Sequence, residues 1–133
     1  MPTPQTTRNL IEIAARGAVD KLATTIVALD VSDRLPLTDA FLIATGANER
    51  QVKAIVDEVE HRLAEAGVRA ERREGYQEAR WVLVDFGDLV VHVQHAEERE
   101  YYALERLWHD CPLIDLPDDV REGARENENE DEQ

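Results

Sequence analysis

The sequence is poor in the side chains that most often act as nucleophiles. Its 133 residues include one cysteine, one serine and two lysines. Cys111 has no partner for an internal disulfide, so nothing indicates an oxidising compartment. Ser32 lies in no G-x-S-x-G context, and neither lysine belongs to a G-x-x-x-x-G-K loop. Covalent catalysis and P-loop chemistry are therefore poorly supported.

Long apolar segments are also missing. No apolar run approaches the roughly 20 residues of a membrane-spanning helix. The first ten residues, MPTPQTTRNL, contain no apolar segment of a secretory signal. These features predict a cytoplasmic protein that does not associate with a membrane. Aromatic residues make up only 5% of the chain, but the apolar fraction of 43% is sufficient for one hydrophobic core.

Positive charge is scarce, with 15 basic residues against 29 acidic ones and a formal net charge of −14. This balance argues against a partner such as duplex DNA, whose phosphates require cations. It favours a basic partner, or it serves solubility alone. Residues 118–133 hold eight of the acidic residues and almost no apolar content after Val120. We therefore predict one domain over residues 1–117, followed by a disordered acidic tail over 118–133.

Hydrophobic periodicity predicts the order α-β-β-α-β-β-β-α. The segments are a helix over 7–22, strands over 26–31 and 40–45, a helix over 48–66, a short edge strand within 68–79, a hairpin over 81–86 and 89–93, and a helix over 97–109. This order predicts an α/β (α+β) fold with a mixed five-stranded sheet flanked by helices.

Several local signals fix element boundaries. Thr6 or Thr7 can cap the first helix. Asn48 and Gln51 have the spacing of a capping box, and Gly67 occupies the expected position after the helix end. The dipeptide Gly87-Asp88 between two apolar runs is typical of a tight hairpin turn.

Two pairs of residues raise the question of a metal site. His92 and His95 are three residues apart, so on a continuous strand they point to opposite faces. They could chelate one ion only if the strand ends near Gln94. His109 and Cys111 form a second pair, but zinc needs three or four ligands and no further pair lies nearby. We predict no metal and no cofactor.

The carboxylates do not form an obvious catalytic pair. Asp30 with Asp33, and Asp85 with Asp88, lack the D-x-D spacing that suits two-metal nucleotidyl transfer. The segment 45–48 enters a helix N-terminus and could meet an anion. It lacks the G-x-G-x-x-G pattern, so a simple capped turn is the favoured interpretation.

The strand that begins at Trp81 has two different faces. Val82, Val84 and Phe86 form an apolar face that belongs to the core. Trp81, Leu83 and Asp85 form a mixed face, which suits an exposed binding surface with a tryptophan anchor. A helix that covers this face, with Asp85 satisfied locally, would explain the same pattern.

The segment 81–93, WVLVDFGDLVVHV, resembles the W-x-x-x-D-x-G-D-x-x-V-H signature of the ribosomal silencing factor family, also called the Iojap-related family. Three more segments agree in order: 26–31 (IVALDV), 38–51 (TDAFLIATGANERQ) and 101–108 (YYALERLW). The resemblance covers roughly residues 7–116, and its four ordered motifs make it specific.

The resemblance implies that the protein binds the large ribosomal subunit at ribosomal protein L-fourteen. There it would block joining of the small subunit and lower translation when nutrients are scarce. This mechanism is steric and catalyses no reaction. The resemblance also implies a nucleotidyltransferase-like topology without the catalytic site. Ribosomal proteins are basic, so an acidic chain is a suitable partner.

The resemblance assigns seven residues to the partner-binding surface: Trp81, Leu83, Asp85, Asp88, His92, Tyr101 and Tyr102. Trp81 would be the hydrophobic anchor, and Asp85 and Asp88 would accept hydrogen bonds from basic side chains. Gly87 would shape the hairpin turn.

Other hypotheses remain open at this point. The chain could be a divergent nucleotidyltransferase-fold enzyme that acts on a nucleotide or RNA, with metal-dependent nucleotide binding near 45–48 and Asp85. The acidic segment 118–133 could itself be the ligand for a basic protein. A face rich in aromatic and aliphatic side chains could also self-associate, so we expect a homodimer of the free protein.

Overall fold

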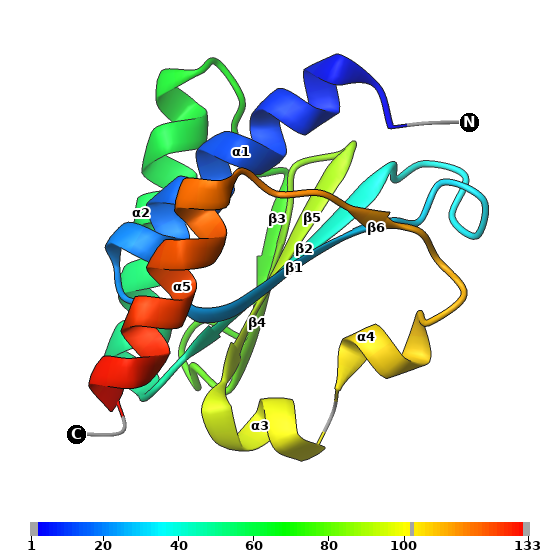
Figure 1. The fold of residues 1–133 in the computed structure, drawn as a ribbon. Helices are drawn as coiled ribbons and strands as arrows, with labels where there is room; N and C mark the ends of the chain where they lie inside the picture. The colour runs from blue at the N-terminus through cyan, green and yellow to red at the C-terminus, as the bar shows by residue number, and fades with distance from the viewer. Residues whose placement is uncertain (1–2, 102, 132–133) are drawn as a thin grey trace.

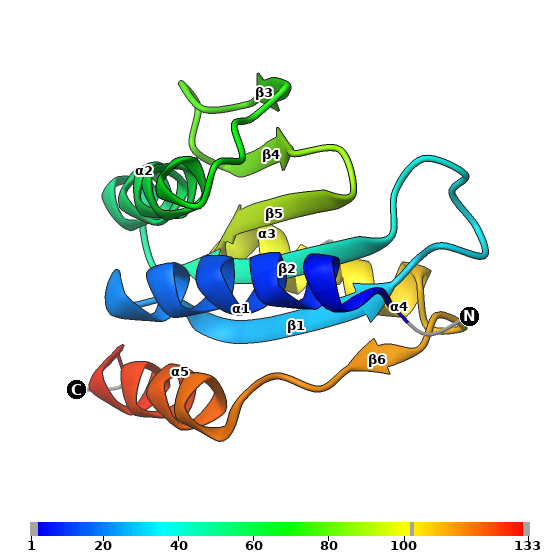
Figure 2. The same cartoon turned by 90° about the horizontal axis from the view of Figure 1, so that it is seen from above.

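The computed structural model describes residues 3–101 and 103–131. Its sheet (Figure 1) has the strand order β3-β4-β5-β2-β1-β6, which can be followed in Figure 2. The strands are β1 (Thr24–Asp30), β2 (Ala40–Gly46), β3 (Arg72–Glu74), β4 (Trp81–Asp85), β5 (Leu89–His95) and β6 (Leu113–Ile114). β2 and β5 are parallel, and every other neighbouring pair is antiparallel. The mixed sheet is confirmed, with six strands in place of five because the two-residue β6 adds to β1.

Three long helices cover one face of the sheet. They are α1 (Gln5–Asp20), α2 (Glu49–Glu65) and α5 (Asp118–Asp131). The short helices α3 (Ala96–Tyr101) and α4 (Leu104–Leu107) lie on the opposite face, as Figure 2 shows. None of the helices in the described ranges has the length and apolar character needed to cross a bilayer.

The two faces bury cores of different size. The larger core lies beneath the three long helices and includes Leu42 and Val91 from the central strands with Ile55 and Val56 from α2. The smaller core lies on the opposite face and contains seven buried residues: Leu29, Val31, Phe41, Ile43, Val90, Leu104 and Cys111. The second face is therefore less completely covered than the first.

Local capping explains where α2 begins and ends. The Asn48 side chain accepts a hydrogen bond from the backbone N–H of Gln51 at 2.9 Å, which confirms the predicted cap. The Gln51 side chain accepts one from the backbone N–H of Ala47 at 3.0 Å. Gly67 has a positive φ of 88° directly after the helix, a conformation that glycine adopts readily.

The first helix differs from the prediction at its start. α1 begins at Gln5, and its N-cap is Pro4 with no side-chain cap bond. The predicted cap Thr7 lies inside the helix, and its hydroxyl donates to Asp39 Oδ2 at 3.0 Å. Thr7 therefore ties α1 to the end of the loop before β2.

The C-terminal segment also differs from the prediction. Residues Asp118–Asp131 form α5, which packs on α1 and β1. Val120 and Ala124 are buried, and the Asn127 amide donates to the carbonyl oxygens of Val19 at 3.1 Å and Ala23 at 2.9 Å. Acidic residues add contacts at the edge of this stripe, where Asp119 pairs with Arg16 of α1 and Glu128 accepts from the Thr25 hydroxyl of β1. A segment of low hydrophobicity therefore folds onto the domain through one narrow stripe.

The single helix expected over 97–109 is two short helices. Ala103 is extended, with φ −77° and ψ 92°, so α3 does not continue into α4. Leu104 then inserts into the smaller core, where it is 3% exposed.

Candidate partner-binding face

β4 carries the mixed face that the sequence predicts. Val82 and Val84 are fully buried beneath α2, whereas Trp81, Leu83 and Asp85 are half-buried on the opposite side. Trp81 and Leu83 pack against the rim of the smaller core. The two short helices therefore leave part of this face accessible. We call the half-buried face of Trp81, Leu83 and Asp85 the β4 face.

Aromatic rings connect the β4 face to the smaller core. The Trp81 indole Nε1 donates a hydrogen bond to His92 Nδ1 at 3.2 Å. The His92 ring contacts Phe41 edge to face at a centroid distance of 4.7 Å, and Phe41 contacts Trp108 in the same way at 4.9 Å. Such edge-to-face contacts favour one fixed arrangement of the rings. The tryptophan is thus held by the structure before any partner arrives.

His92 lies beneath the surface and is 6% exposed. Burial lowers the pKa of its imidazole to about 4, so the ring is neutral at pH 7. Because Nδ1 accepts the indole hydrogen bond, the proton of the neutral ring is on Nε2. Within the described residues, Nε2 has no hydrogen-bond partner. The buried His92 ring therefore fixes the orientation of the Trp81 indole through the hydrogen bond at Nδ1.

The two predicted carboxylates of the hairpin between β4 and β5 have different surroundings. Asp85 Oδ1 accepts the backbone N–H of Gly87 at 2.8 Å, so this carboxylate stabilises its own turn. Gly87 has φ 91°, which confirms its role in shaping the turn. The Asp88 side chain is exposed, while its carbonyl oxygen accepts the N–H groups of Asp39 at 2.8 Å and Ala40 at 3.1 Å.

Only one of the two predicted tyrosines lies in the part of the chain that the structure describes. Tyr101 is the last residue of α3, and Tyr102 falls outside the described residues. Arg80 lies directly before β4. It forms ion pairs with Glu97 at 2.8 Å and Glu98 at 3.2 Å, both on α3. The N-terminal part of α3 is therefore anchored beside Trp81.

The structure adds a neighbouring cluster that the sequence analysis did not assign to the site. The Arg34 guanidinium stacks over the Trp108 ring at 4.3 Å and pairs with Asp110 at 2.9 Å. Leu107 and Leu113 in the same region are 63% and 72% exposed. The signal available in the sequence was Trp108, an aromatic residue at the end of the segment 101–108 that carries the family resemblance.

The residues required by the enzyme hypothesis are separated in the structure. Asp85 pairs with Val90 at the start of β5, and Thr45 pairs with Gln94 near its end. Four residues of strand span about 13 Å. His92 and His95 lie on opposite faces, as predicted for a continuous strand. Among the described residues, no group of three or more His, Cys, Asp or Glu could hold a metal ion.

The fold and the β4 face define a single-domain α+β protein that presents a fixed aromatic and aliphatic surface beside an acidic hairpin. Such a surface suits binding to another macromolecule. A model of the family described as "Ribosomal silencing factor during starvation" matches residues 4–133. The chain belongs to the ribosomal silencing factor family.

Individual relatives agree with this assignment. The ribosomal silencing factor RsfS of Bacillus subtilis is 48% identical over 109 residues, which are 82% of this chain and 92% of that protein. A crystal structure from Bacillus halodurans has a TM-score of 0.72 at 44% identity and covers 82% of this chain and 99% of that chain. A mouse protein named "Mitochondrial assembly of ribosomal large subunit protein 1" is 33% identical over 89 residues, 65% of this chain and 39% of that protein.

Proposed function

We propose that the protein binds the large ribosomal subunit through the β4 face and prevents the small subunit from joining. The contact would be made with ribosomal protein L-fourteen, in the cytoplasm, and would lower translation when nutrients are scarce. Membership of the ribosomal silencing factor family supports this proposal. The name of the mouse relative also refers to the large ribosomal subunit. The action is steric and requires no catalysis.

The observation that carries the proposal is the fixed position of Trp81 on a half-covered sheet face. Its indole is held by His92, and Leu83 extends the apolar strip along the same strand. An aromatic anchor that is ordered before binding loses little conformational entropy in the complex. Trp81 is therefore suited to fill an apolar pocket on a protein partner.

Charge supports a basic partner. The net charge is −14, and the exposed carboxylate of Asp88 lies on the hairpin beside the β4 face. A basic ribosomal protein would be attracted to this side of the molecule, and the association rate would fall as salt screens the charges. Asp88 would then set the speed and orientation of docking more than its final strength.

Sedimentation with purified ribosomal subunits tests the proposal. The protein should travel with isolated large subunits and reduce the fraction of joined ribosomes when small subunits are added. Trp81→Ala should weaken binding by about 2 kcal/mol, or about 30-fold. Leu22→Ala is the control, because Leu22 is 43% exposed after the end of α1, away from β4. Unchanged joining at a saturating excess of wild-type protein would refute the proposed function.

We also propose that the free protein forms a homodimer through its apolar exposed residues. Leu107 on α4 and Leu113 on β6 are largely exposed. Leu113 pairs with Leu29 of the smaller core, against which Trp81 and Leu83 of the β4 face also pack. Hydrophobic side chains in such a position are stabilised by a second apolar surface. Light scattering should give a dimer mass at micromolar concentration, and a Leu107→Glu, Leu113→Glu double variant should be monomeric. A monomer mass for the wild type would contradict this.

A further inference from the structure

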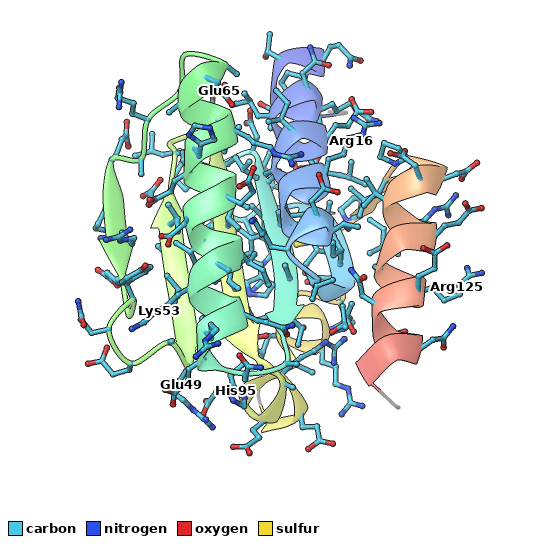
Figure 3. The ribbon with its side chains drawn as sticks, turned by 90° about the vertical axis from the view of Figure 1, so that its left-hand side faces the viewer. Arg16, Glu49, Lys53, Glu65, His95 and Arg125 are labelled. Carbon is cyan, nitrogen blue, oxygen red and sulfur yellow. The ribbon has the colours of Figure 1, made fainter. Side chains whose placement is uncertain are left out.

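An open cavity of about 510 Å³ lies where β5 ends and α2 begins. Its lining consists of Asn48, Glu49, Arg50 and His95. Figure 3 shows Glu49 and His95 together at this end of α2. The volume falls in the range of small-molecule sites, which is roughly 300–1,000 Å³. None of these residues belongs to the β4 face.

The backbone of α2 presents unused donors to this cavity. The first four N–H groups of a helix have no partner inside the helix. The N–H of Gln51 is satisfied by the Asn48 side chain, at 2.9 Å. In the described part of the chain, no acceptor is found for the N–H groups of Glu49 and Arg50. These donors stand at the positive end of a 17-residue helix.

A buried imidazole provides a second, independent donor. His95 is 8% exposed and lines the cavity. Its Nδ1 accepts the backbone N–H of Glu97 at 3.1 Å, so Nε2 carries the proton of the neutral ring. No other described residue forms a hydrogen bond with the His95 ring. The Nε2–H is solvent-accessible and has no acceptor among the described residues, so it is available to a ligand in the cavity.

The charges around the cavity allow an anion to enter. Arg50 is exposed and forms no ion pair with a described residue. Glu97 and Glu98, close to His95, are paired with Arg80, which also holds the pKa of Glu97 below its usual range. Glu49 is the one carboxylate in the cavity lining, and it would oppose anion binding.

We infer that this cavity binds a phosphate group of a small molecule of nucleotide size. The N–H groups of Glu49 and Arg50, the Arg50 guanidinium and His95 Nε2 would donate to the phosphate oxygens. The inference concerns binding alone and does not rest on the proposed action at the ribosome. It also differs from the enzyme hypothesis, because Asp85 lies toward the opposite end of β5.

Titration of ¹⁵N-labelled protein at constant ionic strength tests the inference by NMR. Inorganic phosphate and adenosine diphosphate serve as probes, each with and without magnesium. The amide signals of residues 49 and 50 should shift and saturate, with dissociation constants in the millimolar range. Tighter binding of adenosine diphosphate would show that the cavity holds more of the ligand than one phosphate group, and equal binding would show recognition of a single phosphate alone. Both results support the site.

Charge-matched variants locate the anion. Arg50→Gln should weaken binding about tenfold, and Glu49→Gln should strengthen it several-fold. Arg125→Gln on α5 is the control, because it removes the same charge at a distance (Figure 3) and should leave binding unchanged. The inference is overturned if residues 49 and 50 do not shift, or if Arg125→Gln weakens binding as much as Arg50→Gln.

Discussion

The indole N–H of Trp81 donates to the Nδ1 atom of a buried, neutral histidine, His92, at 3.2 Å. The two residues lie on neighbouring antiparallel strands, where Trp81 pairs with Gln94 and Leu83 pairs with His92. They are diagonal neighbours on one face, within reach of large side chains. The aromatic residue of the β4 face is thus positioned by a residue that is itself 6% exposed.

If His92 positions Trp81, then His92→Phe should weaken binding to the large ribosomal subunit by several-fold. The phenyl ring fills much of the same space but cannot accept the indole hydrogen bond, so the indole is free to leave its binding orientation. His92→Gln retains an acceptor and should restore part of the affinity. Sedimentation with large subunits measures affinity, and circular dichroism verifies that each variant is folded. Equal affinity for His92→Phe and the wild type would exclude the positioning role.

The lowered pKa of His92 predicts a pH dependence of stability. The pKa is about 4 in the folded protein and 6.5 in the unfolded chain, so the unfolded state binds more protons between these values. The free energy of unfolding should therefore be highest above pH 6.5 and should decrease as the pH falls toward 4. The loss of unfolding free energy that is due to His92 over this pH range is about 3 kcal/mol.

Urea denaturation at a series of pH values measures this effect. Carboxylates also titrate in the same range, so the His92→Gln variant is needed as a reference. The difference in unfolding free energy between wild type and variant should change between pH 6.5 and 4 and be constant above pH 7. A constant difference over the whole range would contradict burial of a neutral His92.

Local sequence signals predicted a large part of this fold. Asn48, Gly67 and Gly87 set the ends of α2 and the hairpin turn through interactions between residues close in sequence. The register that joins Trp81 to His92 depends on this short turn, so the alternating faces of both strands could also be predicted. The β4 face is a consequence of these local features.

The remaining elements depend on contacts that no local pattern reveals. α5 was expected to be disordered because its composition is highly charged, yet Val120, Ala124 and Asn127 recur four and three residues apart and meet α1 and β1. The pairing of Arg34 with Trp108 joins residues that are far apart in the sequence. Phosphate binding at residues 48–50 could be suspected from the helix start, but the contribution of His95 could not.

Gly75 should tolerate alanine less well than Gly67. Both glycines have a positive φ, 84° and 88°, so alanine strains the backbone at each by about 1 kcal/mol. A methyl group at Gly75 would also collide with the carbonyl oxygen of Trp81, whereas one at Gly67 would meet no atom within 4 Å. Thermal unfolding should show a clearly larger loss of Tm for Gly75→Ala. Equal losses would mean that the loop before β4 can shift without cost.

Asn127 should be the residue that fixes α5 to the domain. Its amide satisfies the carbonyl oxygens of Val19 and Ala23, where α1 ends and β1 is about to begin, and the residue is 9% exposed. Asn127→Ala removes both hydrogen bonds, although the Val19 oxygen keeps the backbone N–H of Leu22, and should reduce the free energy of unfolding by about 1–3 kcal/mol. Asn129→Ala is the matched control, because it removes the same amide from an exposed position of the same helix and should change stability by less than about 0.5 kcal/mol. Chemical denaturation of both variants gives the comparison. Equal stability of the two would show that α5 is held by Val120 and Ala124 alone.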